Sequence, residues 1–165
     1  MLKLDLQVSE HYQLRDFCKS STALSLNIDL SDPPNEVIEN IKRVAIKVEE
    51  ASKILECKIN INSGWRPERL NTAIGGSKTS AHIMGLAVDM FPARVKNADD
   101  LHNCFYLLAN HPSWMADIDQ LIQERGCVHL GLASGKLPRR ELRGEVYTAE
   151  GKRTYPLVRI WEFNG

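Results

Sequence analysis

The sequence predicts an α+β fold, with a small, mostly antiparallel sheet and helices packed on one side of it. Two segments, at about residues 34–56 and 97–110, repeat apolar residues at three- and four-residue steps, which is typical of amphipathic helices. Shorter segments alternate apolar and polar residues and are bounded by turn residues, which is typical of strands and hairpins. Helical and strand patterns therefore occur together in one chain.

Length and composition indicate one domain over residues 1–165. A chain of 165 residues can bury about two-thirds of its unfolded surface. Lys plus Arg equals Asp plus Glu at 21 each, and this balance gives no electrostatic case for a nucleic acid or a membrane surface as partner. We therefore expect a monomer that binds a small or neutral substrate in a pocket, and no nucleic-acid partner.

The same sequence bears on cellular location. Its first six residues lack the continuous apolar region of a signal peptide, and no run approaches the roughly 20 apolar residues of a membrane span. We expect cytoplasmic synthesis without a signal peptide. The cysteines are widely spaced without a CxxC pair, so we expect reduced and mostly buried thiols at Cys18, Cys57, Cys104 and Cys127.

The first half of the chain leads up to a loop. Residues 1–30 are irregular with scattered apolar side chains, and we expect a packing arm that lies on the core. The segment 32–36 has prolines and acids suited to a helix start, so the helix of about 34–56 begins there. Residues 58–62 alternate as a strand, which delivers Ser63-Gly64-Trp65-Arg66 to a loop. A short helix then opens at Pro67 and closes at Gly75-Gly76.

The second half predicts a hairpin. The helix of 97–110 starts near Asn97 or Asp99. The segment 118–122 reads as a strand, Arg125-Gly126 as a turn and 127–132 as the returning strand. Residues 134–143 are polar and basic and predict a solvated loop, with contact to an anionic wall polymer as the alternative for Lys136, Arg139, Arg140 and Arg143. The segments 146–147 and 157–163 are candidate edge strands.

The stretch from Ser77 to Phe91 contains the candidate metal ligands. Gly85 permits a turn after His82, and a strand follows in which Leu86, Val88 and Met90 point one way and Ala87, Asp89 and Phe91 the other. Asp89 is thus a carboxylate on an apolar strand, where an unpaired charge is unfavourable, so a cation should meet it. Imidazole and carboxylate are both zinc ligands. A loop histidine bonded only to backbone is the alternative for His82.

His129 is the third candidate ligand. It alternates with Val128 and Leu130, so its side chain points away from theirs, as a ligand projecting into a cleft would. The alternative is a strand histidine satisfied by a neighbouring side chain. A catalytic zinc site keeps three protein ligands and an open position for water.

Several ordered motifs together resemble one family of enzymes. Ser80-x-His82-x-x-Gly85-x-Ala87-x-Asp89 is similar to the signature of the M15-type zinc D-Ala-D-Ala carboxypeptidases, which act on peptidoglycan. The likeness, closest to the phage-like branch, covers about residues 9–150 and extends to Ser63-Gly64-Trp65-Arg66, Asp119-Gln120-Leu121-Ile122 with Glu124, Val128-His129-Leu130 and Arg139-Arg140-Glu141. It implies a fold of the hedgehog/DD-peptidase type. It also implies one Zn²⁺ per chain, held by His82, Asp89 and His129.

The resemblance leaves the general base open. Some members have a glutamate three residues before the last histidine ligand and others a histidine two before it, but this chain has Gly126 and Cys127 there. We expect Glu124 to serve as the base, with Asp119 as runner-up. Asp119 is better suited to orienting a ligand histidine. Val128 replaces an aromatic residue of many relatives.

Three other side chains near the predicted site also have two interpretations. The resemblance implies that Arg66 contacts substrate near the scissile bond, where its planar fork could bind a carboxylate or oxyanion. A surface arginine stacked on Trp65 is the alternative. Ser80 could bind substrate backbone or cap the turn, and the thiolate of Cys127 could compete for the metal.

The function that follows is hydrolysis of peptide bonds in peptidoglycan stem peptides by a zinc-activated water. The resemblance favours an endolysin-like bacteriophage or prophage enzyme that acts on the cell wall after release, or as a component of the phage particle. A non-catalytic zinc-containing binding module and a structural phage-particle protein of the same fold are the alternatives.

Overall fold

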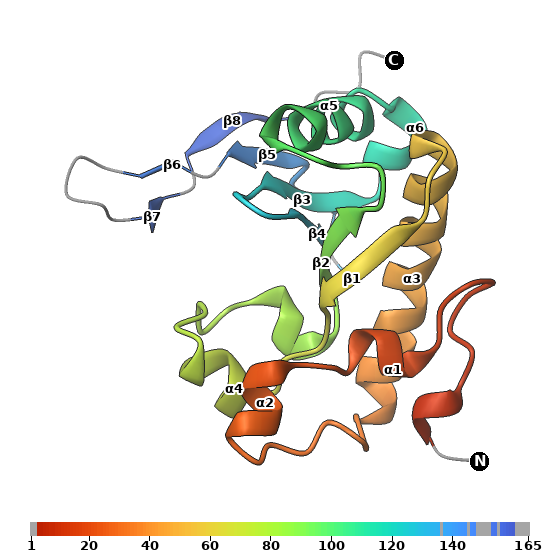
Figure 1. Ribbon diagram of the computed structural model, residues 1–165, viewed down its shortest axis with the longest axis vertical. Helices are drawn as coiled ribbons and strands as arrows, with labels where there is room; N and C mark the ends of the chain where they lie inside the picture. The colour runs from red at the N-terminus through yellow and green to blue at the C-terminus, as the bar shows by residue number, and fades with distance from the viewer. Residues whose placement is uncertain (1–2, 136, 145, 148–152, 155, 161–165) are drawn as a thin grey trace.

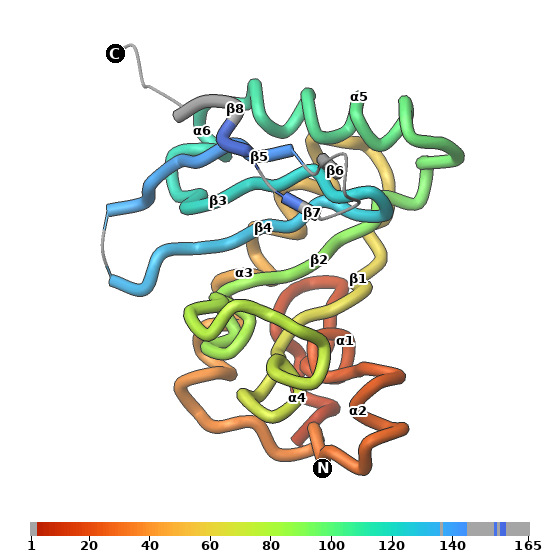
Figure 2. Tube along the Cα trace, turned by 90° about the vertical axis from the view of Figure 1, so that its left-hand side faces the viewer, coloured from red at the N-terminus to blue at the C-terminus, as the bar shows by residue number. Residues whose placement is uncertain are grey.

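The computed structural model describes residues 3–135, 137–144, 146–147, 153–154 and 156–160. Its main sheet has six strands in the order β1-β2-β4-β3-β5-β8 (Figures 1 and 2). These strands span Ile59–Ser63 (β1), Ala87–Pro92 (β2), Val128–Leu132 (β4), Ile118–Gln123 (β3), Glu141–Gly144 (β5) and Leu157–Ile160 (β8). All neighbouring pairs are antiparallel except β3 and β5, so the predicted α+β class with a mostly antiparallel sheet is confirmed.

Two long helices cover one face of this sheet. Helix α3 (Asn35–Leu55) packs against β1 and β2, and helix α5 (Ala98–Ala109) packs against β3 and α3 (Figure 1). Both lie within two residues of their predicted ends. Asn97 caps α5 as expected, because its side chain accepts a hydrogen bond from the backbone N–H of Asp100 at 2.9 Å. Among the described residues, no helix combines the length and hydropathy that a membrane span requires.

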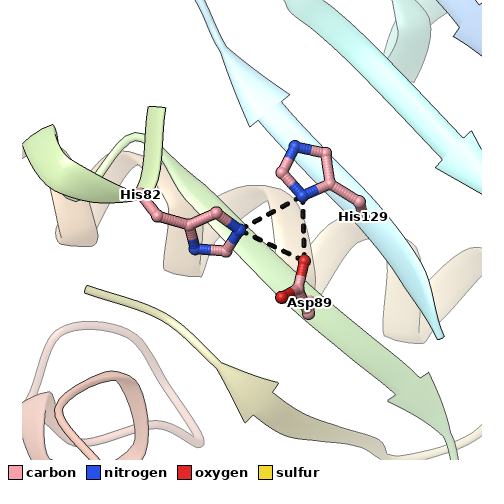
Figure 3. Close-up of side chains that lie close together, drawn as sticks. All are labelled: His82, Asp89 and His129. Carbon is pink, nitrogen blue, oxygen red and sulfur yellow. Dashed lines mark hydrogen bonds and ion pairs between the residues drawn. The ribbon is translucent and has the colours of Figure 1, made fainter. Parts of the chain in front are cut away.

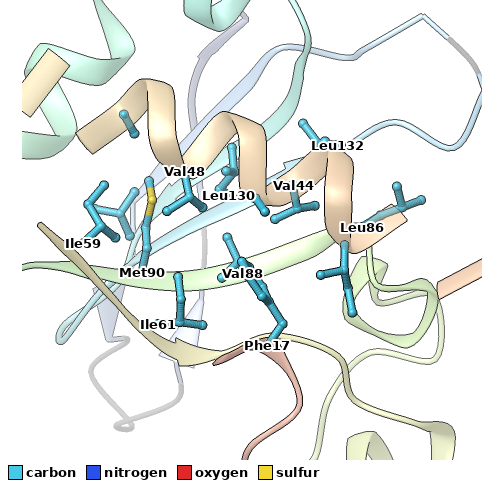
Figure 4. Packing of buried hydrophobic residues seen from close by; sticks show 14 of the residues in the cluster. Phe17, Val44, Val48, Ile59, Ile61, Leu86, Val88, Met90, Leu130 and Leu132 are labelled. Carbon is cyan, nitrogen blue, oxygen red and sulfur yellow. The ribbon is translucent and has the colours of Figure 1, made fainter. Parts of the chain in front are cut away.

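The hydrophobic core fills the space between α3 and the sheet. Val44 and Val48 on α3 lie over Val88 and Leu130 on the sheet, and all four side chains are fully buried (Figure 4). Burying an aliphatic side chain of this size contributes about 1.5–3 kcal/mol. The alternation predicted for β2 is therefore confirmed on its core face.

Short helices occupy the connections. They are η1 (Lys3–Asp5), α1 (Leu14–Phe17), α2 (Ser21–Ser25), α4 (Glu68–Ala73), η2 (Ala81–Met84) and α6 (Pro112–Met115). The first three form the arm, which packs through Val8, Tyr12, Leu14 and Phe17, whereas Leu24 is 80% exposed. All four cysteines are free, and three of them are buried, which confirms the predicted thiols.

The C-terminal part differs from the prediction. Residues 141–143, expected in a loop, belong to β5, because Leu142 is buried while the strand pairs in parallel with β3. Because β3 lies about twenty residues earlier in the chain, the local sequence around β5 gives little indication of this pairing. Val146–Tyr147 (β6) pairs with Arg153–Thr154 (β7) in a separate two-stranded sheet, whereas β8 does form an edge of the main sheet. Residues 161–163 of the predicted edge strand and Lys136 of the basic loop lie outside the described residues.

Candidate metal centre

The sheet face opposite the helices carries two of the predicted ligands. Val88 and Met90 of β2 are buried in the core, so the intervening Asp89 points to the other face. In the antiparallel register of β2 and β4, Asp89 lies directly opposite His129. Directly opposed residues of an antiparallel pair have Cβ atoms about 4.5–5.5 Å apart. Strand pairing thus brings together two residues that are far apart in sequence.

The third predicted ligand comes from the turn that precedes β2. His82 lies in η2, which ends at Gly85 with a φ of 70°. A Cβ at Gly85 would lie 2.9 Å from the backbone oxygen of Val37 on α3, so only glycine fits this close approach. The packing of this turn against α3 therefore determines the position of His82 beside the sheet.

The three side chains converge on one point (Figure 3). Asp89 Oδ1 lies 2.8 Å from His129 Nδ1 and 3.2 Å from His82 Nε2, and the two imidazole nitrogens are 3.2 Å apart. One candidate ligand atom from each residue lies within 4.8 Å of the others. Two imidazole nitrogens and a carboxylate oxygen match the donor set of a catalytic zinc site.

A backbone carbonyl sets the tautomer of His82. The Nδ1 atom of His82 lies 2.6 Å from the carbonyl oxygen of Gly64. Because a carbonyl oxygen only accepts, Nδ1 must donate, and in the neutral ring Nε2 then carries a lone pair. That lone pair faces Asp89 Oδ1, a second acceptor, so a cation at this point would satisfy both atoms. The donor set thus fits a metal ion.

Burial and charge act on the protonation states of the cluster. Burial lowers the pKa of His82 and outweighs the attraction of Asp89, which favours the charged form. The lowered pKa favours the neutral imidazole that a metal requires. Burial alone would raise the pKa of Asp89. Interactions with the imidazoles of His82 and His129 outweigh burial and hold this pKa well below its usual range.

Arg66 lies beside this cluster. Its Nη2 is 3.5 Å from Asp89 Oδ2, and its backbone N–H donates to the carbonyl of His82 at 3.1 Å. Asp89 thus faces the histidines with one oxygen and a guanidinium with the other. A cation does meet the partly buried carboxylate as expected, and the substrate-binding role of Arg66 stays a prediction.

The other predicted site residues have contacts of their own. Ser80 precedes η2, but its side chain makes no capping hydrogen bond there. The thiol of Cys127 donates to Glu124 Oε2 at 3.5 Å, and Cys127 is not part of the candidate metal cluster. The backbone N–H of Glu124 donates to the carbonyl of Cys127 at 3.0 Å, which closes the hairpin around Arg125 and Gly126. The roles of Glu124 and Ser80 stay predictions.

Asp119 has a partner that the sequence interpretation did not anticipate. Its carboxylate accepts hydrogen bonds from the backbone N–H, Nε and Nη2 of Arg139, the last at 2.6 Å. Among the described residues, no hydrogen bond joins Asp119 to either ligand histidine. The orienting contact that the structure does show is made by Gly64 O, which no side-chain pattern could have indicated. The interactions with Arg139 hold the pKa of Asp119 below its usual range, against the effect of burial.

Comparison with protein families bears on the same stretch of chain. Residues 10–109 match the model described as Peptidase M15. The chain belongs to the Peptidase M15 family. Membership implies a metallopeptidase, and His82 and Asp89 both lie within the matched residues. His129 lies beyond the matched residues, so its assignment as the third ligand of this M15 peptidase rests on the strand register. No curated protein matches the chain.

Proposed function

We propose that this M15 peptidase uses one Zn²⁺ per chain to hydrolyse peptide bonds in peptidoglycan stem peptides. The observation that supports the proposal is the convergence of His82, Asp89 and His129 within a chain of this family. When bound there, zinc would polarise the scissile carbonyl and lower the pKa of a bound water to about 7.

The protein's own residues would do the rest. Arg66 lies next to Asp89, where its guanidinium can hold a substrate carboxylate or the oxygen that gains charge during attack. Glu124 is proposed as the acceptor of the water proton, which it would pass to the leaving amine. Ser80, at the start of η2, is proposed to bind substrate backbone.

The metal is tested first. Protein purified without chelator should contain about one zinc per chain by elemental analysis, because the site offers three protein ligands. His82→Ala and His129→Ala each remove one ligand and should lose the metal. Full occupancy in both variants would contradict the proposed site.

The reaction is tested next. Muropeptides ending in D-Ala-D-Ala, and cross-linked muropeptides, should be shortened by the zinc-loaded protein, and a chelator should stop the change. Mass spectrometry then gives the bond that is cleaved. Place of action, on the wall after release or within a phage particle, is part of the same proposal and is tested by locating the protein in infected or lysing cells.

A zinc-containing binding module is the competing proposal. The observation in its favour is Gly126, which carries no side chain at the position where some relatives carry a glutamate. Zinc-loaded protein that binds wall fragments but leaves every mass unchanged across neutral pH would support the module.

A further inference from the structure

We propose that the sheet face carrying the metal centre continues into a subsite for a substrate carboxylate, with Arg143 as the group that binds it. The inference rests on the proposed function and specifies one feature of its substrate. The substrate would be a peptide with a free carboxylate two to three residues from the scissile bond.

Strand register places Arg143 in line with the metal ligands. Asp89 on β2 pairs with His129 on β4, and His129 pairs with Ile122 on β3. Ile122 in turn pairs with Arg143 on β5. Paired residues on neighbouring strands project to the same face. Arg143 therefore projects to the face of the metal centre, which agrees with the burial of its neighbour Leu142 on the helix-covered face.

The spacing sets the length of ligand. Neighbouring strands are about 4.7–4.9 Å apart, so two steps from β4 to β5 separate the backbones at His129 and Arg143 by roughly 10 Å. An extended peptide advances about 3.3–3.6 Å per residue. A peptide bound across the strands would thus reach Arg143 two to three residues from a bond held at the metal centre.

Neighbouring side chains orient the guanidinium. Arg143 donates through Nε to Glu141 Oε2 at 3.0 Å. The same oxygen accepts from Gln120 Nε2 at 3.1 Å and lies 3.3 Å from Nη1 of Arg139. These contacts hold the pKa of Glu141 below its usual range, chiefly through its hydrogen bond with Arg143. Glu141 is therefore a positioning residue for Arg143.

The surface between the two points suits a peptide. Ile122 is 8% exposed and provides an apolar floor between His129 and Arg143. The Arg143 side chain is 28% exposed, so part of it can contact a ligand. Arg139, which also lies near Glu141, donates to Asp119 through its Nε and Nη2 atoms. A guanidinium is suited to a carboxylate because it presents its N–H donors in a planar fork.

The test uses two stem peptides, L-Ala-γ-D-Glu-L-Lys-D-Ala-D-Ala with the α-carboxyl of the glutamate either free or amidated. Two residues, L-Lys and D-Ala, separate the glutamate from the terminal D-Ala-D-Ala bond. Zinc-loaded protein should favour the free carboxylate by about 10- to 100-fold in kcat/KM, mainly through KM, as expected for a charge-assisted hydrogen bond. Arg143→Gln should reduce this preference to within about 3-fold, and Arg143→Lys should retain part of it.

Arg43→Gln is the matched control. It removes the same charge from the solvent side of α3, behind the opposite face of the sheet, and should keep the preference. Equal cleavage of the two peptides by the wild-type protein would overturn the subsite and leave the proposed hydrolysis standing.

Calorimetric binding of both peptides to the zinc-loaded protein separates the two proposals. If neither peptide is cleaved, hydrolysis of linear stem peptides fails, while the affinity ratio still decides the subsite. An equal affinity of wild type and Arg143→Gln for the free carboxylate would overturn it.

Discussion

At the scale of single residues, Gly64 links the N-terminal arm to the metal centre. Its carbonyl accepts the Nδ1–H of His82, and a Cβ at this position would lie 2.4 Å from the backbone oxygen of Phe17. The next residue, Trp65, donates its backbone N–H to that same oxygen at 2.8 Å. The N-terminal arm thus packs against the loop whose Gly64 carbonyl orients His82.

Replacing Gly64 should therefore disturb the metal site. Gly64→Ala forces the loop away from Phe17, so we expect a loss of about 1–3 kcal/mol in the free energy of unfolding. We also expect zinc affinity to fall by about 10- to 100-fold, as it does when an orienting partner is lost. Gly126→Ala is the control, because a Cβ there meets nothing within 4 Å. Normal zinc affinity in Gly64→Ala would show that its carbonyl does not orient His82.

Glu124 and Asp119 can be separated by isosteric changes. If Glu124 is the general base, Glu124→Gln should keep zinc and lower the rate by about 10²–10⁴-fold. Asp119 binds Arg139 in this structure, so Asp119→Asn should leave zinc affinity near that of the wild type. Metal analysis and steady-state rates test both. Wild-type turnover in Glu124→Gln together with an inactive Asp119→Asn would make Asp119 the general base in place of Glu124.

At the scale of elements, Glu49 joins the arm to helix α3. Its buried carboxylate accepts hydrogen bonds from the hydroxyl of Ser9 at 2.9 Å and the backbone N–H of His11 at 2.6 Å. His11 Nδ1 lies 3.0 Å from the other oxygen. Burial raises the pKa of Glu49, but these hydrogen bonds outweigh burial and lower it overall.

We call these contacts of Glu49 with Ser9 and His11 the Glu49 clamp. The clamp predicts that the stability of the folded protein depends on pH. A carboxyl whose pKa is lower in the folded state stabilises the protein above its unfolded pKa of about 4.3, and this stability is lost as pH falls through the folded value. Glu49→Gln should be less stable at pH 7 by about 1–3 kcal/mol. The difference should shrink in acid. Thermal melts of both proteins between pH 7 and pH 3 measure it, and a constant difference would contradict the clamp.

At the scale of the whole molecule, metal and fold are coupled through strand pairing. His129 reaches Asp89 only when β4 pairs with β2, so an ion bound by both stabilises the folded chain and not the unfolded one. Free zinc at 100 times its Kd should add about 2.7 kcal/mol to the free energy of unfolding. Thermal unfolding with zinc and with chelator measures this. His129→Ala should show no response, and an equal response in that variant would place the metal elsewhere.

The sequence by itself determined the features that depend on local pattern. Residue periodicity was enough for α3, for α5 and for the two faces of β2, because a helix or strand buries residues at its own period. The glycine turn and alternation also identified His82 and Asp89 as candidate ligands.

Tertiary structure alone decided the pairings between distant segments. The register that brings His129 to Asp89, the parallel pairing of β5 with β3 and the partner of Asp119 each join residues at least 20 positions apart. Gly64 acts through a backbone carbonyl, which every residue has, so its contact with His82 has no signature in the sequence. Such contacts depend on how whole strands and loops pack, and local side-chain patterns do not specify them.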